Sequence, residues 1–223
     1  LRLGGWSFDS LPKGLADIPG LTDLFLYYCN SLQNVDGLAN CTKLTKLDLS
    51  NCGSLQNVDG LANCTKLTEL YLSDCDSLQN VDGLANCSFG LDNPSWSFRD
   101  LYKRGTNPDY NKLLTESEGT LDLSGCQSLQ NLNGLANCKN LISLILADTN
   151  IKSLPEGLDK ITNLIHLDLS NNMFESLPKG LAAISNLTSI YLVNCTSLKN
   201  LDGIDLATGL KHIIVKDCPS LKD

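Results

Sequence analysis

The sequence predicts a curved α/β solenoid in which each turn of the chain adds one short strand to a single parallel β-sheet. Leucine is by far the commonest of the 223 residues, and leucines recur every 23 residues, as at Leu21, Leu44 and Leu67. Each repeat begins with the pattern LxxLxL. Because alternate side chains of a strand point to opposite faces, these leucines face inward and the residues between them face outward.

The repeats are so similar that they align with one another. The string SLQNVDGLANC occurs at 31–41, 54–64 and 77–87, and the same register resumes from Leu141 to Leu210. When the first leucine of a repeat is position 1, apolar residues recur at positions 1, 4, 6, 18 and 21. One turn cannot bury its own apolar edge, so we expect the turns to stack around a continuous core.

With about nine copies in register, the chain resembles the leucine-rich-repeat family over all but about 28 residues. The resemblance implies a parallel β-sheet on the concave face and 3-10 or irregular segments on the convex side. We divide the chain into repeats 1–89, a non-repeat insertion 90–117 and repeats 118–223, with the first and last repeats partial. Neither end carries a polar or disulfide cap, so we expect either a part of a longer chain or ends that a partner covers. We otherwise expect a monomer.

Two kinds of repeat occur, one with CxSLxN(V/L)xG, as at Cys52–Gly60, and one with SLPxGL, as at Ser153–Leu158. This mixture is similar to the repeat regions of plant intracellular immune receptors. Near-verbatim tandem copies are common in bacterial leucine-rich-repeat surface and effector proteins, and the copying here favours the bacterial group.

Position 17 is glycine in every repeat that reaches it, which indicates a turn where backbone geometry or tight packing disfavours a side chain. These residues are Gly14, Gly37, Gly60, Gly83, Gly134, Gly157, Gly180 and Gly203.

The 10 cysteines fall into two columns of the repeat. In the family that the chain resembles, position 9 turns inward and can hydrogen-bond to the neighbouring turn; here it otherwise holds Trp6, Thr149 or Asn172. Position 21 otherwise holds Ile or Ala, so it needs a small buried hydrophobe. We expect free thiols rather than disulfides or metal ligands, because no CxxC pair occurs. The columns are Cys29, Cys52, Cys75, Cys126, Cys195 and Cys218 at position 9, and Cys41, Cys64, Cys87 and Cys138 at position 21.

The insertion 90–117 interrupts the period. Asn93-Pro94 and Asn107-Pro108 each look like the start of a helix, so we expect two short helices. The insertion leaves the solenoid just before a strand and so borders the concave face. It either helps to form a binding surface or packs onto the side of the solenoid. The residues that would take part in binding are Trp96, Phe98, Arg99 and Tyr102.

The outward strand positions predict a surface that binds a partner protein, because exposed aromatic side chains beside acids are typical of such surfaces. The strongest candidates for the centre of binding are Phe25, Tyr27, Tyr28 and Tyr71. The complete predicted set is Phe25, Tyr27, Tyr28, Asp48, Tyr71, Asp74, Asp122, Ile145, His166, Asp168, Tyr191 and His212.

The leading function is therefore a protein-recognition module whose partner carries a basic patch. A net charge of −8 argues against a nucleic-acid partner. The alternatives are the targeting arm of a ligase or kinase whose catalytic domain lies outside this chain, and an adhesin or glycan-binding surface. No nucleotide-binding or metalloprotease motif occurs, so we expect no catalysis, cofactor or metal.

No apolar run is long enough to span a membrane. Buried free thiols favour a reducing compartment, meaning the cytosol, or the host cytosol for a secreted effector, with the cell surface as the alternative.

Overall fold

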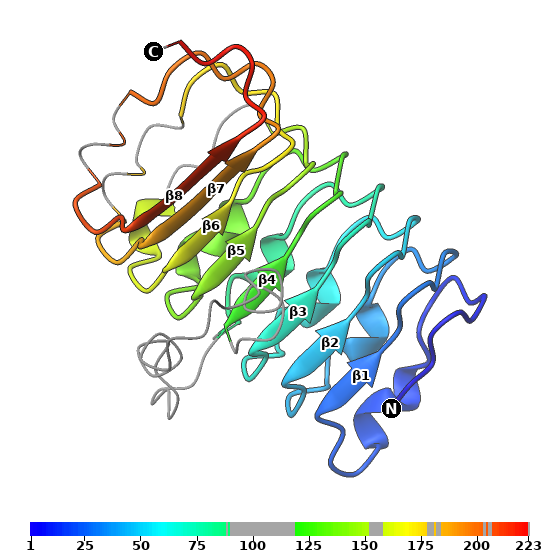
Figure 1. Ribbon diagram of the computed structural model, residues 1–223. Coiled ribbons are helices and arrows are strands. Elements are labelled where there is room, and N and C mark those ends of the chain that lie inside the picture. Colours follow the sequence, from blue (N-terminus) through cyan, green and yellow to red (C-terminus); the bar gives the residue numbers. More distant parts are fainter. Residues whose placement is uncertain are drawn as a thin grey trace, which may run out of the picture.

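The computed structural model describes residues 1–87, 89, 119–151, 158–177, 181, 184–202, 204 and 207–222, and confirms the predicted solenoid. Eight strands form one parallel sheet in which spatial order follows sequence order (Figure 1). The two helices expected in the insertion, and its residues Trp96, Phe98, Arg99 and Tyr102, lie outside the described residues. The strands are β1 (Asp23–Phe25), β2 (Lys46–Asp48), β3 (Glu69–Tyr71), β4 (Thr120–Asp122), β5 (Ser143–Ile145), β6 (His166–Asp168), β7 (Ser189–Val193) and β8 (His212–Lys216).

The sheet keeps the register of the repeats. Leu24, Leu47 and Leu70 are aligned on consecutive strands, and Leu70 is aligned with Leu121 although the insertion separates them in sequence. The first partial repeat extends this ladder, because Arg2 forms a further parallel bridge with Phe25. Equivalent positions of neighbouring repeats therefore lie side by side across the whole sheet.

In the described turns that lead from β1 to β6, and in the first turn, the side opposite the sheet holds short 3-10 helices, as expected (Figure 1). An asparagine at position 14 starts several of them by accepting a hydrogen bond from the backbone two residues on. Asn57 Oδ1 accepts from the Asp59 N–H (3.2 Å), and Asn80 Oδ1 accepts from the Asp82 N–H (3.1 Å). The helices are η1 (Lys13–Asp17), η2 (Asp36–Leu38), η3 (Asp59–Leu61), η4 (Asp82–Leu84), η5 (Asn133–Asn137) and η6 (Leu158–Lys160).

The core is one continuous cluster that runs along the solenoid. The leucines at positions 4 and 6, such as Leu47 and Leu49, are fully buried. Removing apolar surface from water in this way is the main force that holds the turns together.

Among the described residues, tight packing and not unusual backbone angles explains the position-17 glycines Gly37, Gly60, Gly83 and Gly134. A Cβ atom at Gly83 would lie 2.1 Å from the Val58 carbonyl oxygen, and one at Gly60 would lie 2.1 Å from that of Val35. Gly14 has nothing within 4 Å of its Cβ position. Only glycine allows consecutive turns to approach this closely.

The cysteines are free, as predicted, and all except the half-buried Cys218 are buried. At position 9 the thiols donate to a carbonyl of the preceding turn, as Cys75 Sγ does to the Leu49 oxygen (3.2 Å). Asn172 takes over this role in its repeat, donating from Nδ2 to the Leu146 oxygen (2.7 Å). Burial raises the pKa of the Cys126 thiol to about 12, so it behaves as a small protonated hydrophobe.

The position-17 contact can be tested with a matched pair of substitutions. Gly83→Ala should destabilise the protein by about 3 kcal/mol, because its methyl group would overlap the Val58 carbonyl. Gly14→Ala, at the same position of the first turn, should change stability by less than about 0.5 kcal/mol. Urea unfolding of both variants measures the difference, and equal losses would contradict the packing explanation.

The thiols also predict a loss of stability in alkali. Burial raises the pKa of the Cys138 thiol to about 12, so the folded protein keeps a proton that the unfolded chain releases above about pH 9. The free energy of unfolding should therefore fall between about pH 9 and 12, by up to about 1.4 kcal/mol per pH unit for each such thiol.

Urea unfolding at pH 8 and at pH 10.5 gives this slope. The control is Cys138→Ile, because Ile161 occupies the same position, fully buried, in the next repeat. This variant should show a shallower fall with pH. An unchanged slope would mean that this thiol does not contribute.

Candidate functional site

The structure places the predicted residues outside the insertion on the strands of one sheet or just beyond their ends. The position-5 side chains of consecutive strands are in register, so Phe25, Asp48, Tyr71 and Asp122 are neighbours. The predicted binding residues that the structure describes fall into two regions that differ in exposure. We call the first region the N-terminal patch; it consists of Phe25, Tyr27, Tyr28, Asp48, Tyr71 and Asp74, all half-buried or exposed.

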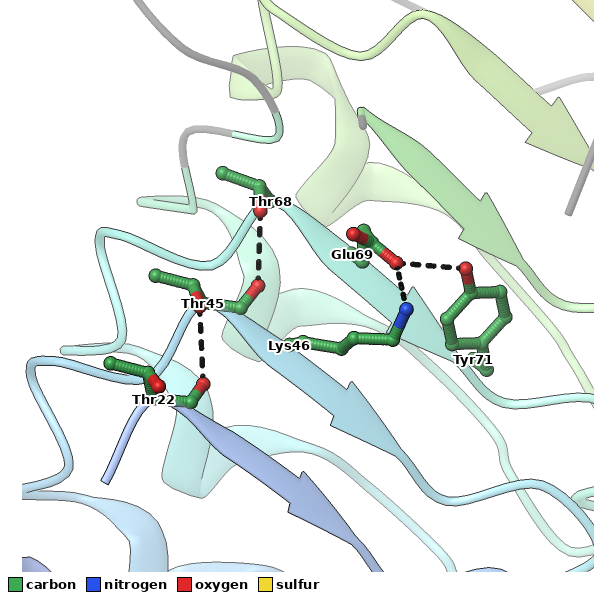
Figure 2. Close-up of polar contacts among 6 residues, drawn as sticks. All are labelled: Thr22, Thr45, Lys46, Thr68, Glu69 and Tyr71. Carbon is green, nitrogen blue, oxygen red and sulfur yellow. Dashed lines mark hydrogen bonds and ion pairs between the residues drawn. The ribbon is translucent and has the colours of Figure 1, made fainter. Parts of the chain in front are cut away.

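A group of three polar side chains fixes the middle of the N-terminal patch (Figure 2). Lys46 Nζ forms an ion pair with Glu69 Oε2, which also accepts a hydrogen bond from the Tyr71 hydroxyl (2.9 Å). The same ammonium lies 5.4 Å from the centre of the Tyr71 ring, within cation–π range. Burial, followed by the Glu69 carboxylate, raises the pKa of the Tyr71 phenol well above its usual range, so Tyr71 remains a neutral donor.

The backbone beneath these side chains is held by a ladder of threonines (Figure 2). Thr45 Oγ1 donates to the Thr22 carbonyl (3.2 Å), and Thr68 Oγ1 donates to the Thr45 carbonyl (3.1 Å). The Thr45 N–H also bonds to the Thr22 carbonyl (2.8 Å). Each strand that carries a patch residue is therefore tied to its neighbour just before it begins.

The aromatic side of the patch lies at the end of β1. The rings of Tyr27 and Tyr28 meet edge to face, with centroids 6.2 Å apart and planes at 86°. Tyr28 is 57% exposed and Tyr27 is 37% exposed. A Cβ atom at Gly4 would lie 2.6 Å from the Tyr27 ring, so this ring rests against the first turn. The Arg2 guanidinium lies 5.1 Å from the centre of the Phe25 ring.

The position-5 aspartates share a structural role that the sequence analysis did not predict. Asp48 Oδ1 accepts a hydrogen bond from the Ser50 N–H (3.0 Å), and Asp168 Oδ1 accepts one from the Ser170 N–H (2.9 Å). Asp122 Oδ1 does the same with Ser124. These bonds hold one carboxylate oxygen over the end of its own strand.

The second region, over β4 to β7, corrects the expectation that all the predicted side chains are exposed. Tyr191 is only 8% exposed, and Asp122, Ile145 and His166 are buried as well. Ile145 and Tyr191 pack into one apolar cluster with Ala147 and Ile214. Strand alternation assigns a side chain to a face, but the neighbours in register decide how deeply it is buried.

His166 lies in register between Ser143 on β5 and Ser189 on β7. Both serine hydroxyls are buried and have no hydrogen-bond partner among the described residues. Burial, followed by the charge of His212, lowers the pKa of His166 to about 4. Burial raises the pKa of the neighbouring Asp168. This region therefore holds a neutral imidazole at physiological pH.

Two further residues beside the N-terminal patch were not in the predicted set. Arg2 contacts Phe25, and Trp6 is 60% exposed, unlike the buried cysteines of the same column. The Gly5 N–H donates to the Tyr27 oxygen (2.8 Å), which places Trp6 directly after the residue paired with Tyr27. An aromatic residue in a column of small side chains was the signal that could have identified Trp6.

Within the described part of the chain, no three His, Cys, Asp or Glu side chains are grouped so that they could hold a metal ion. None of the helices described there has the length and apolar content that a membrane crossing requires.

Two segments of the chain, residues 42–86 and 139–183, match the family model described as leucine-rich repeats (2 copies). No curated protein sequence matches the chain. Together with the repeats and the solenoid, the family match shows that these two segments consist of leucine-rich repeats.

Solved structures share this fold. Internalin C2 from Listeria monocytogenes is 21% identical with a TM-score of 0.58, over 92% of this chain and 84% of that one. The leucine-rich-repeat domain of the type III effector XopL is 19% identical with a TM-score of 0.69, over 100% of this chain and 69% of that one. A chain of the mouse RP105/MD-1 complex is 19% identical with a TM-score of 0.54, over 96% of this chain and 33% of that one.

The buried imidazole predicts a loss of stability in mild acid. The unfolded chain binds a proton near pH 6.5, whereas folded His166 binds one only near pH 4. The free energy of unfolding should therefore fall by up to about 3 kcal/mol as the pH drops through this range. The raised pKa values of Asp122 and Asp168 act in the opposite sense, so the measured quantity is the difference between the wild type and His166→Gln.

Urea unfolding at pH 7 and at pH 4.5 gives this difference. His212→Gln is the control and should keep most of the pH dependence, because desolvation of His166 is the larger cause. A His166→Gln variant with the pH dependence of the wild type would contradict the assignment.

Proposed function

We propose that this chain is a protein-recognition module and that its partner binds at the N-terminal patch. One observation carries the proposal: Tyr27 and Tyr28 are both exposed on a face whose other aromatic side chains are buried or half-buried. Tyrosine supplies a large contact area with few rotatable bonds, and it is enriched where binding energy is concentrated.

The rigidity of the patch supports binding rather than simple coverage of the sheet. Tyr71 is held by Glu69 and Lys46, and Tyr27 rests against Gly4. The backbone below is tied by the parallel sheet and the threonine ladder. A surface that is already ordered loses little entropy when a partner binds, so more of the contact energy appears as affinity.

The charge of the patch supports a partner with a basic surface. Two cations of the described residues lie at the patch and are engaged within the chain, Arg2 on Phe25 and Lys46 on Glu69 and Tyr71. Asp48 and Asp74 form no ion pair with a described residue. The remaining charge of the patch is negative, in keeping with the net charge of −8 of the chain. Opposite charge on a partner would speed association and favour one orientation.

The similar structures include a bacterial internalin, a type III effector domain and a chain from a protein complex, RP105/MD-1. They support a binding role for the fold and a place for this chain among bacterial surface or effector proteins. A targeting arm of a larger ligase or kinase would use the same patch. A glycan-binding surface is the competing function, because exposed Trp6 and Tyr28 are also suited to stacking on sugars.

Capture of partners on the immobilised wild-type chain, followed by calorimetry with the purified partner, tests the proposal. The double variant Tyr27→Ala/Tyr28→Ala should lower affinity at least tenfold, because exposed aromatic anchors are worth more than about 1.4 kcal/mol at such surfaces.

The matched control is Gln56→Ala/Gln79→Ala, which changes two exposed side chains on the other side of the turns. It should bind as the wild type does, and thermal unfolding verifies that both double variants are folded. Undiminished affinity of the tyrosine variant would rule out the N-terminal patch, and a partner that proves to be a glycan would rule out protein recognition.

A further inference from the structure

We infer that the partner presents a lysine or arginine side chain that sits on the exposed face of Tyr28, between that ring and the carboxylates of Asp48 and Asp74. This inference rests on the proposed function and specifies the chemistry of the group that the N-terminal patch binds.

The chain already uses this chemistry twice within the same surface. Arg2 lies 5.1 Å from the centre of the Phe25 ring, and Lys46 lies 5.4 Å from the centre of the Tyr71 ring. The ring faces of this surface are thus accessible to cations from the concave side. Among the described residues no cation lies over Tyr27 or Tyr28.

The ring of Tyr28 is more accessible to a partner than the ring of Tyr27. One side of Tyr27 is occupied by Gly4, whose Cβ would lie 2.6 Å from the ring. Tyr28 is the more exposed ring, and its edge-to-face contact with Tyr27 fixes its orientation. Tyr28 also has a left-handed backbone, with φ of 61°, where the chain turns away from β1. The ring is therefore held outward at the end of the strand.

The carboxylate of Asp48 lies on β2, and that of Asp74 lies just after β3. The backbone of Ser50 connects Tyr28 to Asp48. Its carbonyl oxygen accepts a hydrogen bond from the Tyr28 N–H (2.9 Å), and its N–H donates to Asp48 Oδ1 (3.0 Å). Asp74 occupies the same repeat position as Tyr28, two strands further along the sheet, and is exposed. At a strand spacing of about 4.8 Å this separation is about 10 Å, which the long side chains of one basic segment can bridge.

A cation that lies over an aromatic ring and close to a carboxylate is attracted by both groups, and both attractions become stronger as water is excluded. A neutral sugar or a proline-rich segment would stack on Tyr28 but would leave the negative charge of both carboxylates uncompensated. An acidic segment would be repelled. The observations therefore favour a basic peptide segment over these other occupants.

Calorimetric titration of the full chain with N-acetylated hexaarginine and hexalysine peptides tests the inference. Hexaproline and chitohexaose serve as neutral probes. We expect the basic peptides to bind, more weakly at physiological than at low ionic strength, and the neutral probes to bind at least about fivefold more weakly than either basic peptide.

Three variants separate the site from general attraction to an acidic protein. Tyr28→Leu and Asp48→Asn should each weaken hexaarginine binding about fivefold, whereas Tyr28→Phe, which keeps the ring, should not. Asp48→Asn retains an oxygen that can accept from the Ser50 N–H, so it removes the charge with little change in structure. Asp36→Asn removes an exposed carboxylate from a helix on the other side of the turn and should have no more than a small effect.

Equal weakening by Asp48→Asn and Asp36→Asn would overturn the inference, because it would indicate non-specific charge attraction. Preference for either neutral probe would also overturn it. A captured protein partner that is sensitive to Tyr27→Ala/Tyr28→Ala but is not displaced by hexaarginine would refute the cationic occupant and leave the proposed function standing. If the tyrosine variant has no effect on partner binding, the proposed function itself fails.

Discussion

The close approach of consecutive turns is the constraint on which the rest of the structure depends. At Gly83 the backbone passes so near the Val58 carbonyl that no side chain fits. The same contact recurs at Gly60 against Val35. This spacing allows the parallel sheet to form on one side and a second series of backbone contacts, such as Gln79 N–H to the Gln56 oxygen (3.1 Å), to form on the other. It also buries most of the side chains at positions 9 and 21.

The cysteines follow from this constraint and not from sulfur chemistry. A thiol at position 9 is small enough to lie between turns and still donates to a carbonyl, as Cys75 does. Asn172 performs the same task with a stronger donor, and the Thr149 hydroxyl of the preceding repeat donates to Asn172 Oδ1 (3.2 Å). Burial keeps the Cys126 thiol protonated, so these side chains contribute packing and weak hydrogen bonds.

The concave face shows how a regular scaffold yields an irregular surface. Every strand offers position 5 to the same face, yet Tyr71 is half-buried beneath Lys46 and Tyr191 packs with Ile145. The polar group around Glu69 neutralises a cation within the chain and leaves Asp48 as part of an acidic surface. Exposed aromatic side chains and negative charge are therefore both present at the N-terminal patch, although the exposed tyrosines and the aspartates come from different repeats.

The sequence by itself determined the period, the inward columns, the 3-10 side and the free cysteines. Each turn meets only near-copies of itself, so a local pattern such as LxxLxL is enough to specify its neighbours. Only the tertiary structure decided that Tyr28 is exposed while His166 is buried, because burial depends on which different side chains meet across adjacent turns. The same reason explains Trp6: it shares a column with buried cysteines, but its place in the first turn leaves it exposed.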